Sequence, residues 1–314
     1  MINKTFWKNR PTLIFGGSGF IGSALKRRLE GLGADVTAPS SGRVDLVNQH
    51  PWSPPGTRPK TLFNCAAKVG GIEYTSTRPA ECISDNIEIS MTVFDIVRNY
   101  QNYTSSSLVT LSSACAYPES APVPTPETAL WDGPPTEATG YYGIAKRVQV
   151  SMAEAYHKQY GVNSTTLIPT NVYGPGEHSG SRSHVTRAMV DKYQQAMETG
   201  DPVTFWGTGE ATRDFVYIDD LVDAMLSAAQ AHEDMLGVGV YNIGGGIEVS
   251  IKELADLIGG LMGYRGDVHW NTTKPNGQPR RLLDISMAWD CLGWKPETPL
   301  DEGLVKLIEH VRGE

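Results

Sequence analysis

The sequence predicts an α/β fold of the Rossmann type, with a doubly wound parallel sheet and a smaller mixed α/β C-terminal substrate domain. Short apolar runs alternate with helical segments through the first half of the chain. A glycine-rich turn, residues 16–22, joins the first apolar run to the first helical segment. After about residue 170 the alternation weakens, so we expect domains at 1–170 and 171–314, with some chain crossover between them.

The first strand is expected over Thr12–Phe15, and its helix should run from the glycine turn to about Leu32. Glycines allow a tight turn and a close approach of a pyrophosphate to the backbone. The start of the helix then supplies N–H donors and a positive dipole end. The residues expected to bind this part of a dinucleotide are Gly16, Gly19, Phe20, Ile21 and Gly22.

The end of the second strand, expected over 34–38, indicates which dinucleotide binds. An NAD site usually has Asp or Glu here to bind the ribose 2′-OH. Ser41 and Arg43 follow instead, without a carboxylate, and such groups receive a 2′-phosphate, which favours NADP(H) over NAD. Asp45 lies just beyond and is assigned to the adenine edge. The alternative for Arg43 is a solvated loop charge.

Further strands are expected over 61–67, 107–111 and 165–168, with a proline-rich loop over 50–60 and a long helix over 79–100. Small residues at the end of a strand let the backbone approach a cofactor. The remaining residues assigned to the cofactor site are Ala66, Ala67, Lys146, Pro169, Asn171 and Val172.

Tyr142 and Lys146 stand four residues apart on a helix expected to reach Tyr160, so their side chains project from one face. An ammonium beside a phenol favours the phenolate and lowers the phenol pKa. Such a Tyr protonates a carbonyl oxygen at neutral pH. Ser113, just after the strand over 107–111, suggests a hydroxyl donor to the same oxygen. Taken alone, the Tyr/Lys pair also fits an ordinary amphipathic helix.

The C-terminal part is expected to be mixed in structure. We expect a helix over about 183–197, a hairpin of 203–206 with 213–218 around residues 207–209, a helix capped by Asp219 and Asp220, a strand over 240–243, and a helix over 250–262 begun by a Ser250/Glu253 capping box. Residues 274–281 form a basic loop.

Composition excludes several classes of protein. The net charge of −8 argues against a nucleic-acid binder. No apolar run approaches the ~20 residues that span a bilayer, and the N-terminus lacks the apolar region of a secretion signal. The four cysteines show no paired spacing, so we expect free thiols, no metal site and a cytoplasmic location.

From Thr12 to about Leu307 the chain resembles the extended short-chain dehydrogenase/reductases, and within them the GDP-L-fucose synthases. The glycine turn and the Tyr/Lys pair fit any extended member. Four narrower stretches carry the closer resemblance: 66–72, 113–115 before Tyr117–Pro118, 183–185, and 274–277 with 279–284.

The resemblance implies epimerisation at carbons 3 and 5 and NADPH-dependent reduction at carbon 4 of a GDP-4-keto-6-deoxy sugar. A Cys and a His act as base and acid in that family, and they match Cys115 and His184. Lys146 would tune Tyr142 and hold the nicotinamide ribose. Substrate-binding positions would be Lys192, Trp206, Arg213 and Lys274. Relatives also imply a homodimer. The alternatives are a packed thiol for Cys115 and, for Arg213, a surface ion pair with Asp214 or a nearby carboxylate.

The chain departs from the family pattern near the expected sugar pocket. Thr139–Gly140–Tyr141 replaces the usual Asn-Glu-Pro, Lys192 stands where Arg is common, and residues 177–182 differ. A substrate from a 6-deoxy-heptose or colitose pathway therefore remains an alternative. Two rivals also remain: an NAD-dependent nucleotide-sugar 4-epimerase, which predicts an acid after the second strand, and a cofactor-sensing protein, which would tolerate loss of Tyr142 or Lys146.

Overall fold

The computed structural model describes residues 2–48, 58–70, 72–101, 107–180, 183–231, 237–274 and 276–314. Most of the proline-rich loop expected over 50–60 lies outside these ranges. So do Gly71, Arg182 and Pro275, which belong to segments discussed above.

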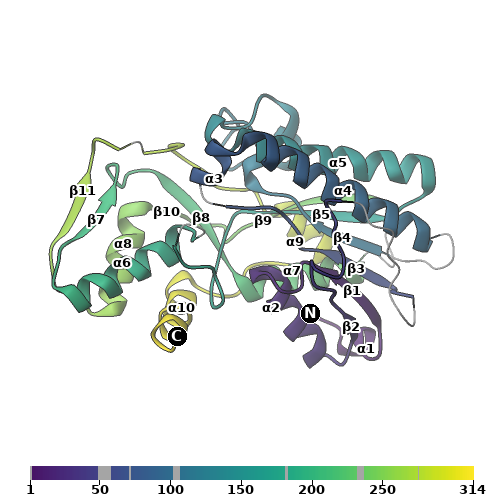
Figure 1. Ribbon diagram of the computed structural model, residues 1–314, viewed down its shortest axis with the longest axis horizontal. Helices are drawn as coiled ribbons and strands as arrows, with labels where there is room; N and C mark the ends of the chain where they lie inside the picture. The colour runs from purple at the N-terminus through teal and green to yellow at the C-terminus, as the bar shows by residue number, and fades with distance from the viewer. Residues whose placement is uncertain are drawn as a thin grey trace.

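The larger lobe is built on a six-stranded sheet of the described residues, in the order β2-β1-β3-β4-β5-β9 (Figure 1). Its strands are β1 (Pro11–Phe15), β2 (Asp35–Thr37), β3 (Thr61–Asn64), β4 (Ser107–Leu111), β5 (Ser164–Pro169) and β9 (Val238–Ile243). Every neighbouring pair is parallel. The chain leaves β1 toward β2 on one side and returns to β3 on the other, so the topological switch point lies between β1 and β3. Ligands of such sheets bind there, beyond the carboxyl ends of the strands.

Helices cover both faces of this sheet. They are α1 (Lys4–Trp7), α2 (Phe20–Gly31), α3 (Ile72–Thr77), α4 (Pro79–Gln101), α5 (Gly140–Tyr160), α7 (Ile218–Ala231) and α9 (Ser286–Leu292), with 3-10 turns η1 (Ala114–Ala116), η2 (Glu127–Trp131) and η3 (Glu137–Thr139). In Figure 1, α4 and α5 lie above the sheet, and α2 and α7 lie below it. The predicted doubly wound fold is confirmed.

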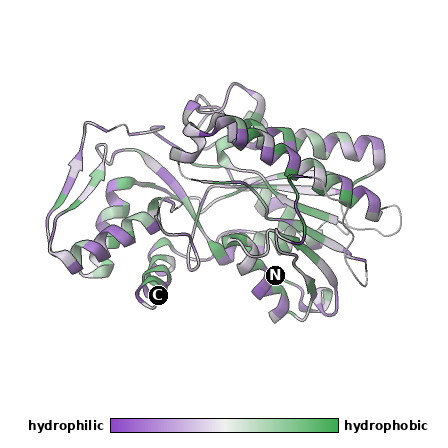
Figure 2. Cartoon of the chain, in the orientation of Figure 1, coloured by the Kyte–Doolittle hydropathy of each residue, from purple (hydrophilic) through white to green (hydrophobic). Residues whose placement is uncertain are grey.

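The alternation of side chains along the strands explains the two layers. Leu13 and Phe15 of β1 pack with residues of α4, whereas Ile14 packs with residues of α2 and α7. A strand buried on both faces is largely apolar, as Leu13–Phe15 of β1 is, and the buried Thr12 hydroxyl donates to the Arg10 carbonyl at 3.1 Å. Figure 2 shows the apolar residues on the strands and on the inward sides of these helices.

The smaller lobe holds β6 (Asn171–Tyr173), β7 (Val203–Trp206), β8 (Thr212–Tyr217), β10 (Glu248–Ser250), β11 (Val268–Asn271), α6 (Val185–Thr199), α8 (Ile251–Met262) and α10 (Leu300–Arg312). The predicted hairpin is wrong, because β7 pairs with β11 and β8 pairs with β6 and β10. Gly207 and Gly209 have φ of +75° and +79°, and Asn276 Oδ1 accepts the Thr208 N–H at 2.6 Å. These contacts tie the turn to the 276 loop, and β8 joins another sheet.

Two helices of this part begin close to the predicted positions. The Ser250/Glu253 capping box is present at α8, and Asp219 and Asp220 lie within the first turn of α7 rather than before it. Strand β9 and helices α7 and α9 lie with the larger lobe, although they follow residue 170 (Figure 1). The domain division at residue 170 stays a prediction.

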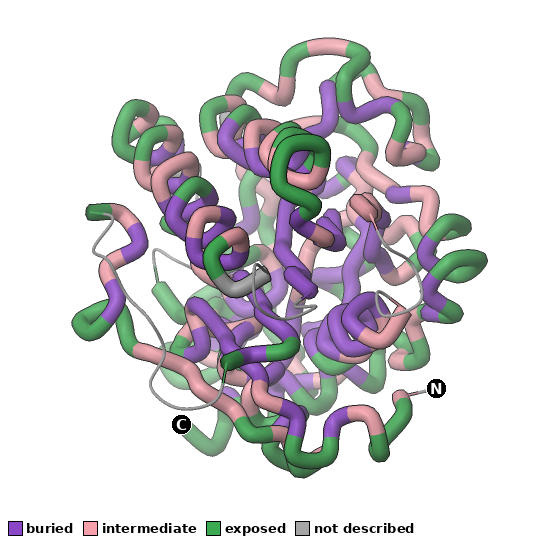
Figure 3. Tube along the Cα trace, turned by 90° about the vertical axis from the view of Figure 1, so that its right-hand side faces the viewer, coloured by how far each residue is buried: buried purple, intermediate pink, exposed green. Residues whose placement is uncertain are grey.

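The buried segments gather at the centre of the molecule, with exposed turns and helix faces around them (Figure 3). Among the described residues no helix is both long enough and apolar enough to cross a membrane.

Candidate active site

Close backbone contacts shape the glycine turn between β1 and α2. Gly16 has φ of +75°, and a Cβ there would lie 2.7 Å from the Ala66 nitrogen. A Cβ on Gly22 would lie 2.1 Å from the Gly16 oxygen. The packing of β1, β3 and α2 therefore requires two of the glycines that the sequence assigns to a dinucleotide.

The first turn of α2 presents backbone N–H donors at the carboxyl edge of the sheet. Its N-cap, Gly19, makes no side-chain hydrogen bond to the turn, so no cap competes for the N–H groups near Phe20 and Ile21. A helix N-terminus of this kind favours a phosphate. The turn fits the pyrophosphate of a nicotinamide dinucleotide. The assignment of individual residues of the turn to this cofactor stays a prediction.

The segment after β2 presents a cation but no carboxylate at its start. Ser41 and Arg43 are exposed, in a turn where the Arg43 N–H donates to the Ser40 carbonyl at 3.0 Å. Among the described residues Arg43 makes no ion pair. Asp45 Oδ1 accepts the Val47 N–H at 3.0 Å, so this carboxylate shapes the next turn. Its assignment to the adenine edge stays a prediction.

The other residues assigned to the cofactor, Ala66, Ala67, Pro169, Asn171 and Val172, lie near the carboxyl ends of β3 and β5. Asn171 also has a structural task, because its Nδ2 donates to the Asp214 carbonyl at 2.8 Å and links β6 to β8. Arg213 precedes Asp214 on β8. Among the described residues it makes no ion pair with Asp214, and its Nη1 donates to two carbonyls instead.

Helix α5 comes unusually close to the turn that carries Ser113 and Cys115. A Cβ on Gly143 would lie 2.2 Å from the Cys115 oxygen. Ser113 caps η1, where its Oγ accepts the Cys115 N–H at 3.2 Å. The glycine inside the Tyr/Lys motif thus lets α5 bring Tyr142 next to these two residues.

Lys146 is buried beneath Tyr142. Its Nζ donates to the Leu111 carbonyl at 2.8 Å and to Gln149 Oε1 at 3.1 Å, and lies 5.7 Å from the centre of the Tyr142 ring. Burial lowers the pKa of Lys146 to about 8. The ammonium is therefore only partly retained above neutral pH.

The expected lowering of the Tyr142 pKa is wrong for this structure. Burial raises the pKa of Tyr142 well above its ordinary range, and nearby Cys115 and Cys82 raise it further. Lys146 does not reverse this, because two acceptors hold its ammonium against the end of β4. Tyr142 consequently stays protonated at neutral pH, which suits a proton donor.

Cys115 behaves in the opposite way, although burial alone would raise the pKa of its thiol. Arg281 lowers that pKa by its charge, hydrogen bonds from Ser113, Thr139 and Arg281 lower it further, and the net pKa is below the ordinary value. Arg281 Nη1 lies 3.9 Å from the sulfur. Cys115 keeps partial exposure, and its role as a base, against the alternative of a packed thiol, stays a prediction.

His184 is the N-cap of α6, and its N–H donates to Glu177 Oε1 at 3.1 Å. Burial lowers the pKa of His184, and His178 lowers it further, although the side chain remains open to solvent. None of these described contacts of His184 is shared with Cys115. The pairing of His184 and Cys115 across a substrate therefore stays a prediction.

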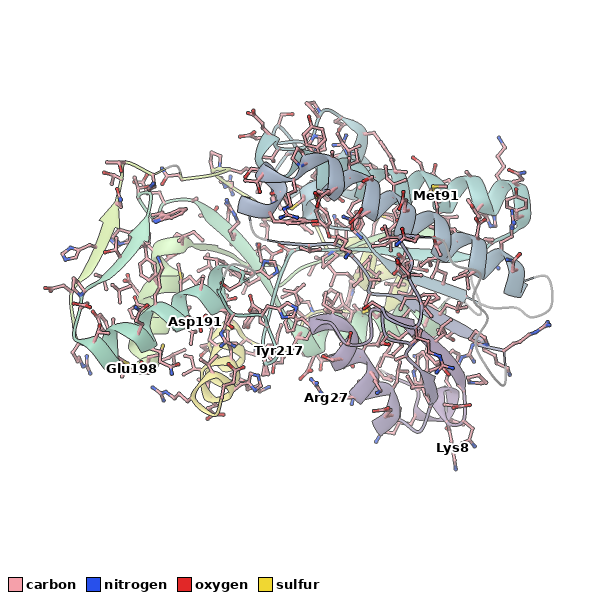
Figure 4. The ribbon with its side chains drawn as sticks, in the orientation of Figure 1. Lys8, Arg27, Met91, Asp191, Glu198 and Tyr217 are labelled. Carbon is pink, nitrogen blue, oxygen red and sulfur yellow. The ribbon has the colours of Figure 1, made fainter. Side chains whose placement is uncertain are left out.

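Burial raises the pKa of Glu177 to about 7, even though Thr186 and His184 donate to it. Arg187 anchors the same turn from α6, because its Nη1 donates to the Glu177 carbonyl at 3.4 Å. Its Nε donates to Asp191 Oδ1 at 2.7 Å within the helix. Asp191 is labelled on this helix in Figure 4.

The four predicted substrate residues lie in the smaller lobe or on the basic loop. Trp206 is 66% exposed, and Lys274 Nζ lies 5.4 Å from its ring centre. Arg213 is half-buried and donates to the Gln278 carbonyl at 2.7 Å. Lys192 is exposed and donates to the Thr204 carbonyl at 2.7 Å. Indole, ammonium and guanidinium groups of this kind suit a nucleotide base and its phosphates.

Sequence reasoning placed Thr139 and residues 177–182 near the sugar pocket without giving them a role, and it gave Arg281 and Gly143 no role of their own. Arg281 was noticed only as one charge of a basic loop, because nothing in the sequence shows that it reaches Cys115 across 166 positions. Gly143 carried a usable signal, since a glycine inside a helix needs a packing reason.

The model of the NAD dependent epimerase/dehydratase family matches residues 12–244. A probable GDP-L-fucose synthase 1 of Oryza sativa subsp. japonica is 36% identical over 304 residues, 95% of this chain and 91% of that protein. A GDP-mannoheptose C4 reductase from Campylobacter jejuni, solved with NADP bound, has a TM-score of 0.83 and 27% identity, covering 97% and 99%. A UDP-glucose 4-epimerase from Thermotoga maritima has a TM-score of 0.82, 27% identity and the same coverage.

Proposed function

This chain belongs to the NAD dependent epimerase/dehydratase family, and we propose that it epimerises carbons 3 and 5 and reduces carbon 4 of a GDP-4-keto-6-deoxy sugar, giving GDP-L-fucose. The observation that carries this proposal is the contact between two elements that each carry a different acid–base group, Tyr142 on α5 and Cys115 on η1. The pKa of Tyr142 is raised, so the phenol stays protonated, whereas the pKa of the adjacent Cys115 is lowered, which favours the thiolate. A plain reductase needs only the first of these groups.

Reduction requires donors to the oxygen on carbon 4. We assign this role to the Tyr142 hydroxyl, with Ser113 as the second donor. A nicotinamide coenzyme, when bound, supplies the hydride. The residues that would hold it are the glycine turn, the start of α2 and Lys146, whose ammonium lies under the Tyr142 ring. Lys146 would also oppose the negative charge that grows on the phenol as it gives up its proton.

Epimerisation requires a base and an acid on opposite faces of the sugar ring. The ketone at carbon 4 acidifies the hydrogens at carbons 3 and 5, and the enolate oxygen is stabilised by the donors described above. We assign Cys115 as the base, because its pKa is lowered. His184 would return the proton from the other face. Its contacts with Glu177 fix the backbone that carries the imidazole.

The GDP group would bind between Trp206 and the cationic side chains of the smaller lobe. Trp206 would stack on the base beside Lys274, and Arg213 would contact the diphosphate with Lys192 nearby. Arg213 Nη1 already donates to two carbonyls, Thr212 and Gln278, so it also fixes the basic loop in place.

We propose NADPH as the physiological coenzyme, because Ser41 and Arg43 follow β2 where NAD sites carry an acid. The Campylobacter jejuni reductase described above was solved with NADP. NADPH should bind at least about tenfold more tightly than NADH, a difference of ~1.4 kcal/mol. Fluorescence titration of both coenzymes measures this, and equal affinities would contradict the choice.

The sugar itself is tested by incubating the protein with GDP-4-keto-6-deoxymannose and NADPH and identifying the product by NMR. GDP-L-fucose is the expected product. A 4-reduced but unepimerised sugar would reduce the proposal to a 4-reductase. No turnover with this ketone, but turnover with a GDP-4-keto-heptose, would move the substrate to the related heptose pathway. Interconversion of nucleotide sugars without consumption of coenzyme would support the rival 4-epimerase.

We also propose a homodimer formed through the outer faces of α4 and α5. Met91, labelled on α4 in Figure 4, is 39% exposed, and Ile144 and Tyr160 on α5 are 38% and 43% exposed. Sedimentation of the full chain tests this, and a monomer at micromolar concentration would contradict it.

A reducing, cytoplasmic setting is consistent with the free thiols of all four cysteines.

A further inference from the structure

Arg281 lies on the basic loop, and its guanidinium is directed at Cys115 by contacts on its other side. Nε and Nη2 donate to Gln278 Oε1 at 3.1 and 2.5 Å, which leaves Nη1 facing the sulfur at 3.9 Å. The backbone N–H of Arg281 donates to the Thr212 carbonyl at 3.2 Å, so the edge of β8 fixes the base of the side chain. The Gln278 side chain and the β8 backbone therefore both fix the position of the guanidinium.

Thr139 approaches the same sulfur from η3. Its hydroxyl oxygen is buried and has no hydrogen-bond partner that meets ordinary geometry among the described residues. It lies near enough to the Cys115 sulfur to be one of the causes that lower the thiol pKa. A buried hydroxyl without an oxygen or nitrogen partner costs free energy unless another acceptor is present. A thiolate is such an acceptor.

We propose that Arg281, assisted by Thr139, is a positioning residue that holds Cys115 in its thiolate form for proton abstraction. The part of this inference that assigns the thiolate as the base rests on the proposed function, whereas the part that Arg281 favours the thiolate does not. The thiol proton leaves to solvent before substrate binds. In the reaction the thiolate takes the proton from carbon, and the electron pair of the C–H bond passes into the enolate. No oxidant or further reactant is required.

Other groups around the sulfur do not replace Arg281. Arg213 is the other guanidinium nearby, but its Nη1 is engaged by the carbonyls of Thr212 and Gln278. Burial, together with the charge of Arg281, lowers the pKa of Arg213 to about 10. Tyr142 on α5 and Cys82 on α4 are protonated weak acids, because burial raises the pKa of each. Arg281 is the cation in hydrogen-bonding distance of the sulfur within the described residues.

The adjacent residue supplies a matched control. Arg280 carries the same charge, but its guanidinium is exposed and pairs with Glu248 at 2.6 Å. Arg280→Gln removes one positive charge from the same loop without touching the thiol. Arg281→Lys keeps a cation but loses the fork that Gln278 holds. Compared with Arg281→Gln, these two variants separate a direct contact from the general field of the basic loop.

The test is the pH dependence of alkylation of Cys115 by iodoacetamide, measured by peptide mapping of the full chain without substrate. Cys291 is exposed and serves as an internal reference in each sample. Arg281→Gln should raise the midpoint at Cys115 by at least about one pH unit, which slows alkylation near neutrality about tenfold. Arg281→Lys should recover part of this shift. Arg280→Gln should leave the midpoint within about 0.3 unit.

An unchanged midpoint in Arg281→Gln, or an equal shift in Arg280→Gln, overturns the proposal. If Arg281→Gln does not fold, Thr139→Val is the second variant, and its midpoint should rise in the same direction by a smaller amount. A role in substrate binding alone would raise KM without moving the midpoint. If the wild-type protein converts no GDP-4-keto sugar and the midpoint still shifts as stated, the proposed function fails and the contact stands.

Discussion

The end of α5 that carries Tyr142 and the turn that carries Cys115 touch each other, and each carries a half-buried weak acid. Burial raises the pKa of Tyr142, and no donor offsets it. Cys115 meets a guanidinium and two hydroxyl groups, and the pKa of its thiol falls. The difference between the two groups therefore comes from their neighbours rather than from their depth.

This contrast shows how two adjoining elements, α5 and the turn that carries Cys115, can supply an acid and a base at the same pH. A protonated phenol suits donation to an oxygen, and a thiolate suits removal of a hydrogen from carbon. The two elements come into close contact at Gly143, and Arg147 Nε of α5 also donates to the Ala116 carbonyl of the turn at 2.6 Å. Each prediction below changes one residue of this pair or of its surroundings, and measures exchange, reduction or stability.

The largest effect is expected on hydrogen exchange. Cys115→Ser and His184→Asn should lose solvent deuterium uptake at carbons 3 and 5, because general acid–base catalysis contributes about 10²–10⁴-fold. Reduction of the unepimerised ketone should persist slowly in both variants. Mass increase of the sugar in D₂O, followed by NMR of the labelled positions, measures the exchange.

Two results would count against this assignment. If the wild-type protein takes up no deuterium, the protein is a plain 4-reductase and the environment of Cys115 has another purpose. If both variants exchange at the wild-type rate, the base and acid lie elsewhere, with His178 the first residue to test because it lies close enough to lower the pKa of His184. NADPH binding by both variants is the control for folding.

Reduction should fail when the phenol is removed. Tyr142→Phe should lower the rate of reduction by at least ~10², since the proton donor to the carbonyl is lost. Deuterium exchange should fall much less, because Cys115 and Ser113 remain. Coenzyme oxidation in a single turnover, measured beside exchange in the same sample, separates the two. Near-normal turnover by Tyr142→Phe would remove Tyr142 from the mechanism.

The contact between the two regions can be tested through Gly143. Gly143→Ala places a Cβ 2.2 Å from the Cys115 oxygen, so α5 or the turn must move, at a cost of about 1–3 kcal/mol in the free energy of unfolding. Gly140→Ala is the matched control, since the nearest atom would lie 3.9 Å away. Urea unfolding of both variants measures the cost. Equal stability of the two would mean that the approach is looser than described.

Much of the larger lobe was predictable because strand, turn and helix signals there are local. The glycine turn, the strand over Ser107–Leu111 and the helix through Tyr160 follow from runs and periods within a few residues. The hairpin failed because pairing depends on competition among strands. Sequence alone could not show that β6 and β10 would occupy the edges of β8.

The site followed the same division. Ser113, Tyr142 and Lys146 belong to local motifs, and the structure places Ser113 and Tyr142 on adjoining elements. The direction of the Tyr142 pKa was wrong, because a Tyr/Lys spacing does not show which acceptors the lysine will meet. Arg281 could not be predicted, since its contact with Cys115 joins positions 166 residues apart.

The smallest expected effect is a difference in pH dependence between the two reactions. Lys146 has a pKa of about 8, lowered by burial, so it is charged below that pH and neutral above it. If its charge supports proton donation by Tyr142, reduction should lose roughly half its rate at pH 8 and fall further above it. Exchange depends on the thiolate of Cys115 and should hold or rise over the same interval. Arg stays charged throughout this range, so Lys146→Arg should be slower but should lose this alkaline limb. Single-turnover reduction and deuterium uptake measured from about pH 6.5 to 9 provide the comparison. If both reactions slow in the same way above about pH 8, or if reduction by Lys146→Arg still slows there, a group other than Lys146 titrates.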